Sequence, residues 1–92
     1  MIILAIQINI QETPNPNSIK INTNQTLFEG PRSTSLKKGD ATDHPLASAL
    51  LGIEGIDNIF GIKDFVTVSK TEDADWDTII PLVEEAFQTV YA

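Results

Sequence analysis

The sequence contains no cysteine. This absence excludes disulfide bonds, zinc sites built on thiolates, iron–sulfur clusters held by cysteine and cysteine nucleophiles. Basic residues are also scarce, because 6 Lys and Arg stand against 13 Asp and Glu and leave a net charge of −7. Since phosphate binding depends on clustered Lys and Arg, we expect no nucleic acid as a partner.

Long apolar segments are also missing where a targeting signal would need one. The run at Met1–Ile6 has six residues. A membrane-spanning helix needs about 20 apolar residues, and a signal peptide needs a basic region before a longer apolar stretch. We therefore expect a cytoplasmic protein with no membrane partner, and a monomer. The length of 92 residues fits a single domain over 1–92.

The hydrophobic pattern predicts a small α+β domain. Residues 2–10 alternate, with Ile2, Leu4, Ile6, Ile8 and Ile10 on one face, as in a strand. Further strands are expected at 18–22, near Arg32–Lys37 at a sheet edge, at 56–60 and at 65–70, with helices from about 45 and to about Tyr91. The order strand–strand–(strand)–helix–strand–strand–helix predicts a two-layer sandwich, with a largely antiparallel sheet of four to five strands and both helices on one face.

Local signals set the expected ends of the helices. Asp43 is predicted to cap the first helix, Pro45 suits its first turn, and Gly55 is predicted to end it in a left-handed conformation. The last helix should be capped by Asp75 or a neighbouring acid. Pro81 lies inside this helix and predicts an irregular first turn or a slight kink.

The segment at residues 11–17 predicts an unusually stiff loop. Pro14 and Pro16 fix their own φ angles and push the preceding residues towards extended conformations. Thr13, Asn15 and Asn17 then present hydroxyl and amide groups on a rigid support, which would lose little entropy on binding. These five residues are the candidate partner-binding site. From the residues alone, the interpretation that the segment is only a well-formed turn is favoured.

The acidic run at 72–77 invites a metal interpretation. Asp73, Asp75 and Asp77 occupy positions 1, 3 and 5 of a calcium loop, but position 6 is Thr78 where glycine is needed. Direct iron or calcium binding by these carboxylates is therefore a weak candidate. Helix capping and surface solvation are the preferred explanation.

The remaining candidates are isolated. His44 is the single histidine, and no neighbour in the sequence is seen to orient it as a base or ligand, so a place in the first turn of a helix is preferred. Lys37 and Lys38 could contact a small anion or a phosphopeptide, although two such lysines are usually only solvated. Trp76 could be a ligand platform, but it more commonly anchors a helix to a sheet. No nucleophile elbow or nucleotide loop is present, so we do not expect an enzyme.

Four motifs in order resemble the N-terminal domain of the Nfu/NifU-type iron–sulfur scaffold proteins. The first is E-T-P-N-P-N-S at 12–18, between two alternating segments. The second, at 44–56, resembles the family's "S-P-L-A … L-F-x-I-E-G-V". Residues 58–68 resemble its "V-F-F-G-x-D-F-I-T-V", and D-W with a following proline at 75–81 resembles its "D-W-x-x-L-K-P".

The resemblance implies a function through protein contacts. Full-length members of that family carry a second domain whose C-x-x-C pair holds the cluster, whereas these 92 residues contain no cysteine. The resemblance is to single-domain versions, and it implies a non-catalytic accessory or scaffold-type module that binds iron–sulfur scaffold or apo-target proteins. No cofactor is expected through cysteine. Residues 13–17 are the expected contact, with His44 and Asp64 as weaker candidates. The alternative is a small-anion or phosphopeptide module unrelated to iron.

Overall fold

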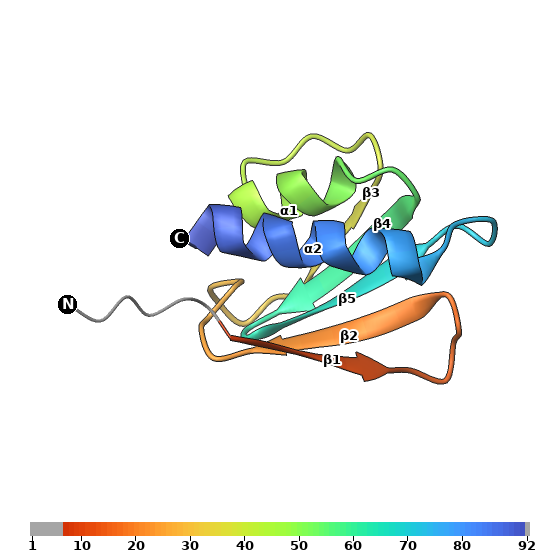
Figure 1. Ribbon diagram of the computed structural model, residues 1–92. Coiled ribbons are helices and arrows are strands. Elements are labelled where there is room, and N and C mark those ends of the chain that lie inside the picture. Colours follow the sequence, from red (N-terminus) through yellow and green to blue (C-terminus); the bar gives the residue numbers. More distant parts are fainter. Residues whose placement is uncertain (1–6, 92) are drawn as a thin grey trace.

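The computed structural model describes residues 7–91, which form one five-stranded antiparallel sheet with two helices on one face (Figure 1). The strand order is β1-β2-β5-β4-β3. The predicted two-layer α+β fold is confirmed. The elements are β1 (Ile8–Glu12), β2 (Ser18–Thr23), β3 (Thr34–Lys37), α1 (Pro45–Leu51), β4 (Ile56–Ile62), β5 (Phe65–Lys70) and α2 (Trp76–Tyr91).

Alternation along the strands places one face of the sheet in the core. Ile19 and Ile21 of β2 pair with Val68 and Val66 of β5, and all four are buried. The helices contribute the opposite half of the core through Leu46 and Leu50 of α1 and Ile79, Val83 and Phe87 of α2. The predicted start of the first strand, with Ile2, Leu4 and Ile6, lies outside the described residues.

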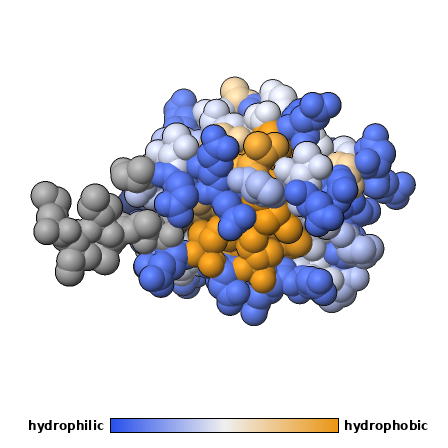
Figure 2. Space-filling model, viewed as in Figure 1, coloured by the Kyte–Doolittle hydropathy of each residue, from blue (hydrophilic) through white to orange (hydrophobic). Residues whose placement is uncertain are grey.

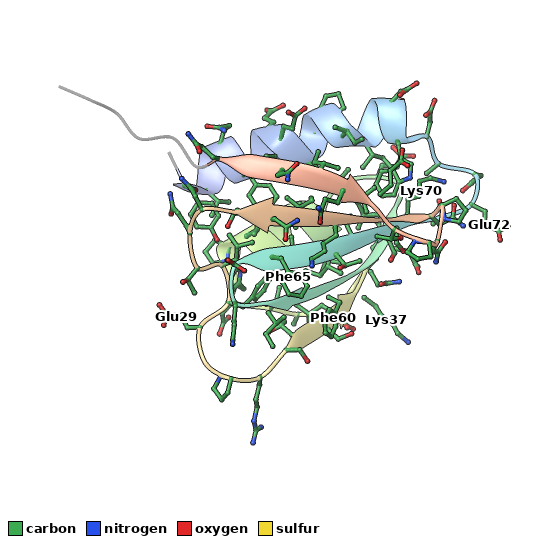
Figure 3. The ribbon with its side chains drawn as sticks, turned by 90° about the horizontal axis from the view of Figure 1, so that it is seen from below. Glu29, Lys37, Phe60, Phe65, Lys70 and Glu72 are labelled. Carbon is green, nitrogen blue, oxygen red and sulfur yellow. The ribbon has the colours of Figure 1, made fainter. Side chains whose placement is uncertain are left out.

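The opposite face of the sheet is open and partly aromatic (Figure 3). Phe60 is 41% exposed there. Phe65 is partly covered by Lys20, whose ammonium lies 4.4 Å from the ring centroid. A cation above an aromatic ring is attracted by the ring's quadrupole, so the lysine shields this apolar side chain from water.

The first helix begins and ends differently from the prediction. His44, not Asp43, is its N-cap, and the ring Nδ1 accepts a hydrogen bond from the Ala47 N–H at 3.2 Å. The helix ends at Leu51, because Gly52 is its C-cap in a right-handed conformation. Gly55 does adopt a left-handed φ of +97°, but it forms the turn that leads into β4.

The hairpin of β4 and β5 has a tight turn, because β4 continues two residues past the predicted strand at 56–60. The turn occupies only Lys63 and Asp64, and Lys63 has a left-handed φ of 54°. Gly61 belongs to β4, where the ring of Phe28 packs against its backbone. The long connection between β2 and β3 therefore packs on this hairpin, and the backbones of Phe28 and Lys63 form an isolated antiparallel β-bridge.

The second helix follows its prediction closely. Asp75 caps it, since the Asp75 carboxylate accepts a hydrogen bond from the Asp77 N–H at 2.9 Å. The helix continues through Pro81 to Tyr91. Within residues 7–91 no helix combines the length and the apolar character needed to cross a bilayer.

Candidate functional site

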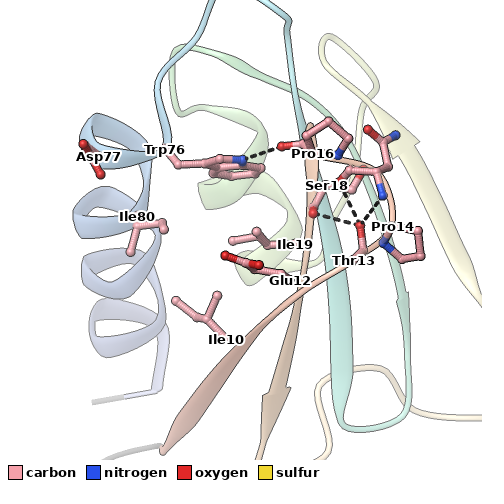
Figure 4. Close-up of a pocket in the computed structure, with 11 residues that line it drawn as sticks. Ile10, Glu12, Thr13, Pro14, Pro16, Ser18, Ile19, Trp76, Asp77 and Ile80 are labelled. Carbon is pink, nitrogen blue, oxygen red and sulfur yellow. Dashed lines mark hydrogen bonds between the residues drawn. The ribbon is translucent and has the colours of Figure 1, made fainter.

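The loop between β1 and β2 is held by its own side chains (Figure 4). The Thr13 hydroxyl accepts a hydrogen bond from the Asn15 N–H at 3.1 Å. It also lies 2.9 Å from the Asn15 carbonyl and 3.0 Å from the Ser18 carbonyl, to which it can donate. The Asn15 side-chain carbonyl accepts from the Asn17 N–H at 2.9 Å. The loop is therefore shaped before any partner arrives.

Two residues from distant elements fix the same loop to the body of the domain. The indole N–H of Trp76, at the start of α2, donates to the Pro16 carbonyl at 2.9 Å. The ammonium of Lys70, at the end of β5, donates to the Asn17 side-chain carbonyl at 2.9 Å. Trp76 thus anchors its helix to the loop rather than simply to the sheet.

A groove of about 570 Å³ lies beside the loop, between β1 and the first turns of α2 (Figure 4). Its apolar lining includes Ile10, Ile19 and Ile80, with Trp76 at the end nearest the loop. Two carboxylates also line it, from Glu12 on β1 and Asp77 on α2. The residues that line the groove are Ile10, Glu12, Thr13, Pro14, Asn15, Pro16, Ser18, Ile19, Trp76, Asp77 and Ile80. None of them is basic.

Apolar side chains reach the surface on this face of the molecule. Figure 2 shows hydrophobic residues gathered at its centre, between α2 and β1. Ile10 and Ile80 are only partly buried, although both pack against the core. An accessible apolar floor with a polar rim is the usual composition of a protein-binding groove.

The sequence identified the loop but not the groove. Thr13, Pro14, Asn15 and Pro16 line one end of the groove, whereas Asn17 does not line it and holds Lys70 instead. No local pattern joins Glu12, Ile80 and Asp77 into one site, because the two walls of the groove are about sixty residues apart in the chain. The one sequence feature that indicates the groove is Trp76. Its indole N–H, at the predicted start of a helix, needs a hydrogen-bond acceptor from another part of the chain.

The His44 side chain has a structural role, because it joins two segments of the backbone. Its Nδ1 accepts from the Ala47 N–H, so its Nε2 carries the hydrogen and donates to the Leu27 carbonyl at 2.7 Å. The ring also stacks on Phe28 with centroids 4.5 Å apart. Both nitrogens are therefore occupied by backbone groups, and the expectation that nothing orients this histidine is wrong.

The two candidate anion-binding lysines have different surroundings. The Lys38 ammonium donates to the carbonyls of Leu51 and Ile53, each at 3.0 Å. It thereby satisfies carbonyl groups at the end of α1, which favour a positive charge. Lys37 is exposed at the end of β3. The pair does not present two uncommitted ammonium groups to an anion.

The acidic run is used for turns and caps. Asp73 accepts from the Thr71 hydroxyl at 2.7 Å, and Asp75 caps α2. Asp77 lies in the first helical turn. In residues 7–91, no three His, Asp or Glu side chains are grouped so that they could hold a metal ion. Asp64 is exposed, and its main-chain carbonyl accepts from the Thr23 N–H at 2.9 Å.

The Thr71–Asp73 contact predicts a measurable pH effect. The hydrogen bond from Thr71, and after it that from the residue's own amide, lowers the pKa of Asp73 below its ordinary value of 3.8. A lowered pKa in the folded state stabilises the protein above pH 3.8, and this stabilisation is lost as the pH falls through the folded pKa. We expect Thr71→Val to raise the pKa of Asp73 towards 3.8, as measured by NMR titration of its side-chain carbonyl carbon. Thr26→Val is the control, and an unchanged Asp73 titration in Thr71→Val would contradict the assignment.

The fold and the site together define a small two-layer α+β domain with a preformed loop beside an apolar groove. Residues 8–92 match the family described as "Scaffold protein Nfu/NifU N terminal". The chain therefore belongs to the Nfu/NifU N-terminal family, which is related to the iron–sulfur scaffold proteins, and the resemblance of the sequence motifs is confirmed.

Relatives of known structure share this architecture. The crystal structure of protein SAV1430 from Staphylococcus aureus is 38% identical, with a TM-score of 0.80, and the match covers 91% of this chain and 99% of that one. The solution structure of a NifU-like protein from Saccharomyces cerevisiae is 26% identical, with a TM-score of 0.79, over 92% of this chain and 77% of that one.

Among curated proteins, "Conserved virulence factor C" of Staphylococcus aureus is 36% identical over 80 residues, which are 87% of this chain and 21% of that protein. "NifU-like protein 5, mitochondrial" of Arabidopsis thaliana is 35% identical over 74 residues, which are 80% of this chain and 27% of that protein. The chain thus spans only about a fifth to a quarter of the length of these relatives.

Proposed function

We propose that the protein is a non-catalytic accessory module of iron–sulfur cluster assembly that binds a cluster scaffold or an apo-target protein in the cytoplasm. The partner contacts the loop at residues 13–17. The observation that carries the proposal is the preformed loop, which is held from within by Thr13 and from outside by Trp76 and Lys70. A surface that is already ordered loses little conformational entropy on binding.

The cluster itself belongs to the partner in this proposal. Iron–sulfur clusters are held chiefly by cysteine thiolates, and these 92 residues contain none. The single histidine donates and accepts through both ring nitrogens within the fold. The described carboxylates form no cluster that could replace thiolates as ligands. The side chains of this chain therefore do not provide the ligands that a bound iron–sulfur cluster needs.

The contact surface of the loop is defined by what its side chains leave uncommitted. Asn15 uses its side-chain carbonyl to hold the Asn17 N–H, which leaves its amide NH₂ exposed for a partner. The rings of Pro14 and Pro16 are exposed beside it. Rigid apolar rings next to an amide donor offer both contact area and hydrogen bonding at low entropic cost.

The double variant Asn15→Ala/Asn17→Ala tests the site. We expect it to weaken binding to a cysteine-bearing cluster scaffold by about tenfold, because it removes the amide donor and loosens the loop, each worth about 0.5–1.5 kcal/mol as a lost hydrogen bond. Isothermal titration calorimetry with the purified scaffold measures the dissociation constant.

Gln25→Ala is the matched control. Gln25 is an exposed amide in the connection that follows β2, at the opposite end of that strand from the loop. Its variant should bind as the unmodified protein does. Amide NMR spectra establish that both variants are folded. Normal scaffold binding by the folded double variant would remove residues 13–17 from the contact surface.

A further inference from the structure

The outer edge of β1 is a row of unpaired backbone groups. Within the described residues, β1 ends the sheet and pairs only with β2. The Asn24 N–H donates to the Gln7 carbonyl at 3.2 Å, so this pair is hydrogen-bonded. Hydrogen-bonded and non-hydrogen-bonded pairs alternate in an antiparallel ladder. The main-chain N–H and C=O groups of Ile8, Ile10 and Glu12 therefore point away from β2, towards the outside.

This edge carries little of the usual protection against pairing. Exposed edges are commonly blocked by charged side chains, above all lysine, by proline, by bulges or by very short strands, and the one charged residue of β1 is Glu12 at its end. The sequence of β1 is INIQE, which contains no lysine or proline, and its register with β2 is regular. The opposite edge is different, because β3 has only four residues and ends in Lys37.

The unprotected edge and the groove form one surface. Ile10 lies opposite Ile21, and Glu12 lies opposite Ile19. Directly opposite residues of paired strands lie on the same face of the sheet, and Ile19 and Ile21 are buried under the helices. The side chains of Ile10 and Glu12 therefore lie on the helix face and line the groove against α2, as Figure 4 shows. A strand added outside β1 would place every second side chain beside this groove.

The charge of the groove indicates the chemistry of such a strand. Glu12 and Asp77 contribute carboxylates from opposite walls, and no basic residue lines the groove. Lys70 contacts the loop beside the groove, and its ammonium is held by Asn17. The whole chain carries a net charge of −7, so two copies repel one another and a basic partner is favoured over a second copy.

We propose that the edge of β1 and the adjoining groove bind an extended, basic segment of a partner protein, which adds an antiparallel strand to the sheet. Main-chain hydrogen bonds to Ile8, Ile10 and Glu12 supply the pairing, as in other cases of strand addition. On the groove side of that segment, apolar residues contact Ile10 and Ile80, and Lys or Arg lies near Glu12 and Asp77. This inference rests on the proposed function and specifies the partner's chemistry at the same site.

The probe is the peptide acetyl-Thr-Lys-Thr-Val-Thr-Lys-Thr-Val-Thr-amide, which alternates Lys and Val on one side. Hydrogen exchange measured by NMR is expected to slow at least tenfold for the amides of Ile8, Ile10 and Glu12 when the peptide saturates the protein. The amides of Asn9 and Gln11 already face β2 and should not change. Such an every-second-residue pattern is specific to strand addition.

Two peptide controls separate backbone pairing from charge. The same peptide with N-methyl groups on both valines loses the valine N–H donors that face β1, and its methyl groups obstruct close pairing, so it should bind at least tenfold more weakly. The same peptide with Glu in place of Lys should not bind at low salt. Equal binding of the N-methylated peptide, or binding without slower exchange in β1, would overturn the proposal.

Two matched double variants test how much the groove carboxylates contribute to peptide binding. Glu12→Gln/Asp77→Asn should weaken peptide binding about fivefold at low salt, and added salt should remove the difference. Glu29→Gln/Glu85→Gln removes two exposed carboxylates outside the groove and should bind normally. Equal weakening by both variants would show a general charge effect and would overturn the groove assignment.

Two further results identify a wrong occupant or separate this inference from the proposed function. If sedimentation shows a dimer and the outward amides exchange slowly without peptide, a second copy covers the edge and the inference is wrong. If the cluster scaffold binds through residues 13–17 while exchange in β1 is unchanged, the inference fails and the proposed function stands. If the peptide binds as expected and no scaffold does, the inference stands and the proposed function fails.

Discussion

Replacing Gly61 by alanine is expected to destabilise the protein by about 2 kcal/mol or more, because β4 has no room for a side chain at this position. A Cβ atom there would overlap the ring of Phe28 and would lie 2.5 Å from its Cζ. Phe28 is 3% exposed and is stacked on His44, so it has little freedom to move. Urea denaturation followed by Trp76 fluorescence measures the free energy of unfolding.

Two variants test whether the overlap is the cause. Gly52→Ala is the control, since a Cβ at Gly52 meets no atom closer than 3.4 Å and the residue has a right-handed φ of −76°. Its stability should change by less than about 0.5 kcal/mol. Adding Phe28→Leu to Gly61→Ala should cost less than the sum of the single changes, because the smaller side chain vacates the overlap. Strict additivity, or a stable Gly61→Ala variant, would contradict this packing.

Replacing His44 by alanine is expected to lower the free energy of unfolding by about 2–4 kcal/mol. The change removes the N-cap of α1, typically worth about 1 kcal/mol. It also deprives the Leu27 carbonyl of its donor, and leaving a buried polar group unpaired costs about 1–3 kcal/mol. Loss of the stacking contact with Phe28 adds to the effect.

The variant His44→Asn separates the contribution of the N-cap from that of the other His44 contacts. Asparagine is a good N-cap residue but is too short to replace the imidazole at both the Ala47 N–H and the Leu27 carbonyl. We expect it to recover about 1 kcal/mol relative to His44→Ala, measured by urea denaturation. If His44→Ala unfolds at the same urea concentration as the unmodified protein, the two hydrogen bonds contribute nothing and the structural role of His44 is wrong.

Much of the fold follows from local pattern. Alternation in the segments that became β1 and β2 predicted strands, and the β-forming residues of 65–70 predicted β5. Ile19, Val66 and Val68 on these strands are buried. Apolar residues at helical spacing likewise form the buried stripe of α2, which includes Val83 and Phe87. These features depend on residues close together in the chain, so single-sequence reasoning could reach them.

The two wrong predictions for the ends of the first helix have a common physical origin. Asp43 is a good N-cap residue by propensity, but His44 takes the position because Leu27 and Phe28 hold its ring from another segment. Gly55 has the expected left-handed φ but does not end α1, because the helix already ends at Leu51 with Gly52 as its C-cap, and there Lys38 from another segment satisfies the Leu51 carbonyl. In both cases a contact between distant segments overrides a local preference.

The same distinction applies to the site. Pro14 and Pro16 made the stiffness of the loop readable from the sequence, because proline restricts its own backbone whatever surrounds it. The groove, its paired carboxylates Glu12 and Asp77, and the open edge of β1 were decided only by tertiary structure. They exist because folding brings α2 beside a strand about sixty residues earlier in the chain, and no local pattern specifies that contact.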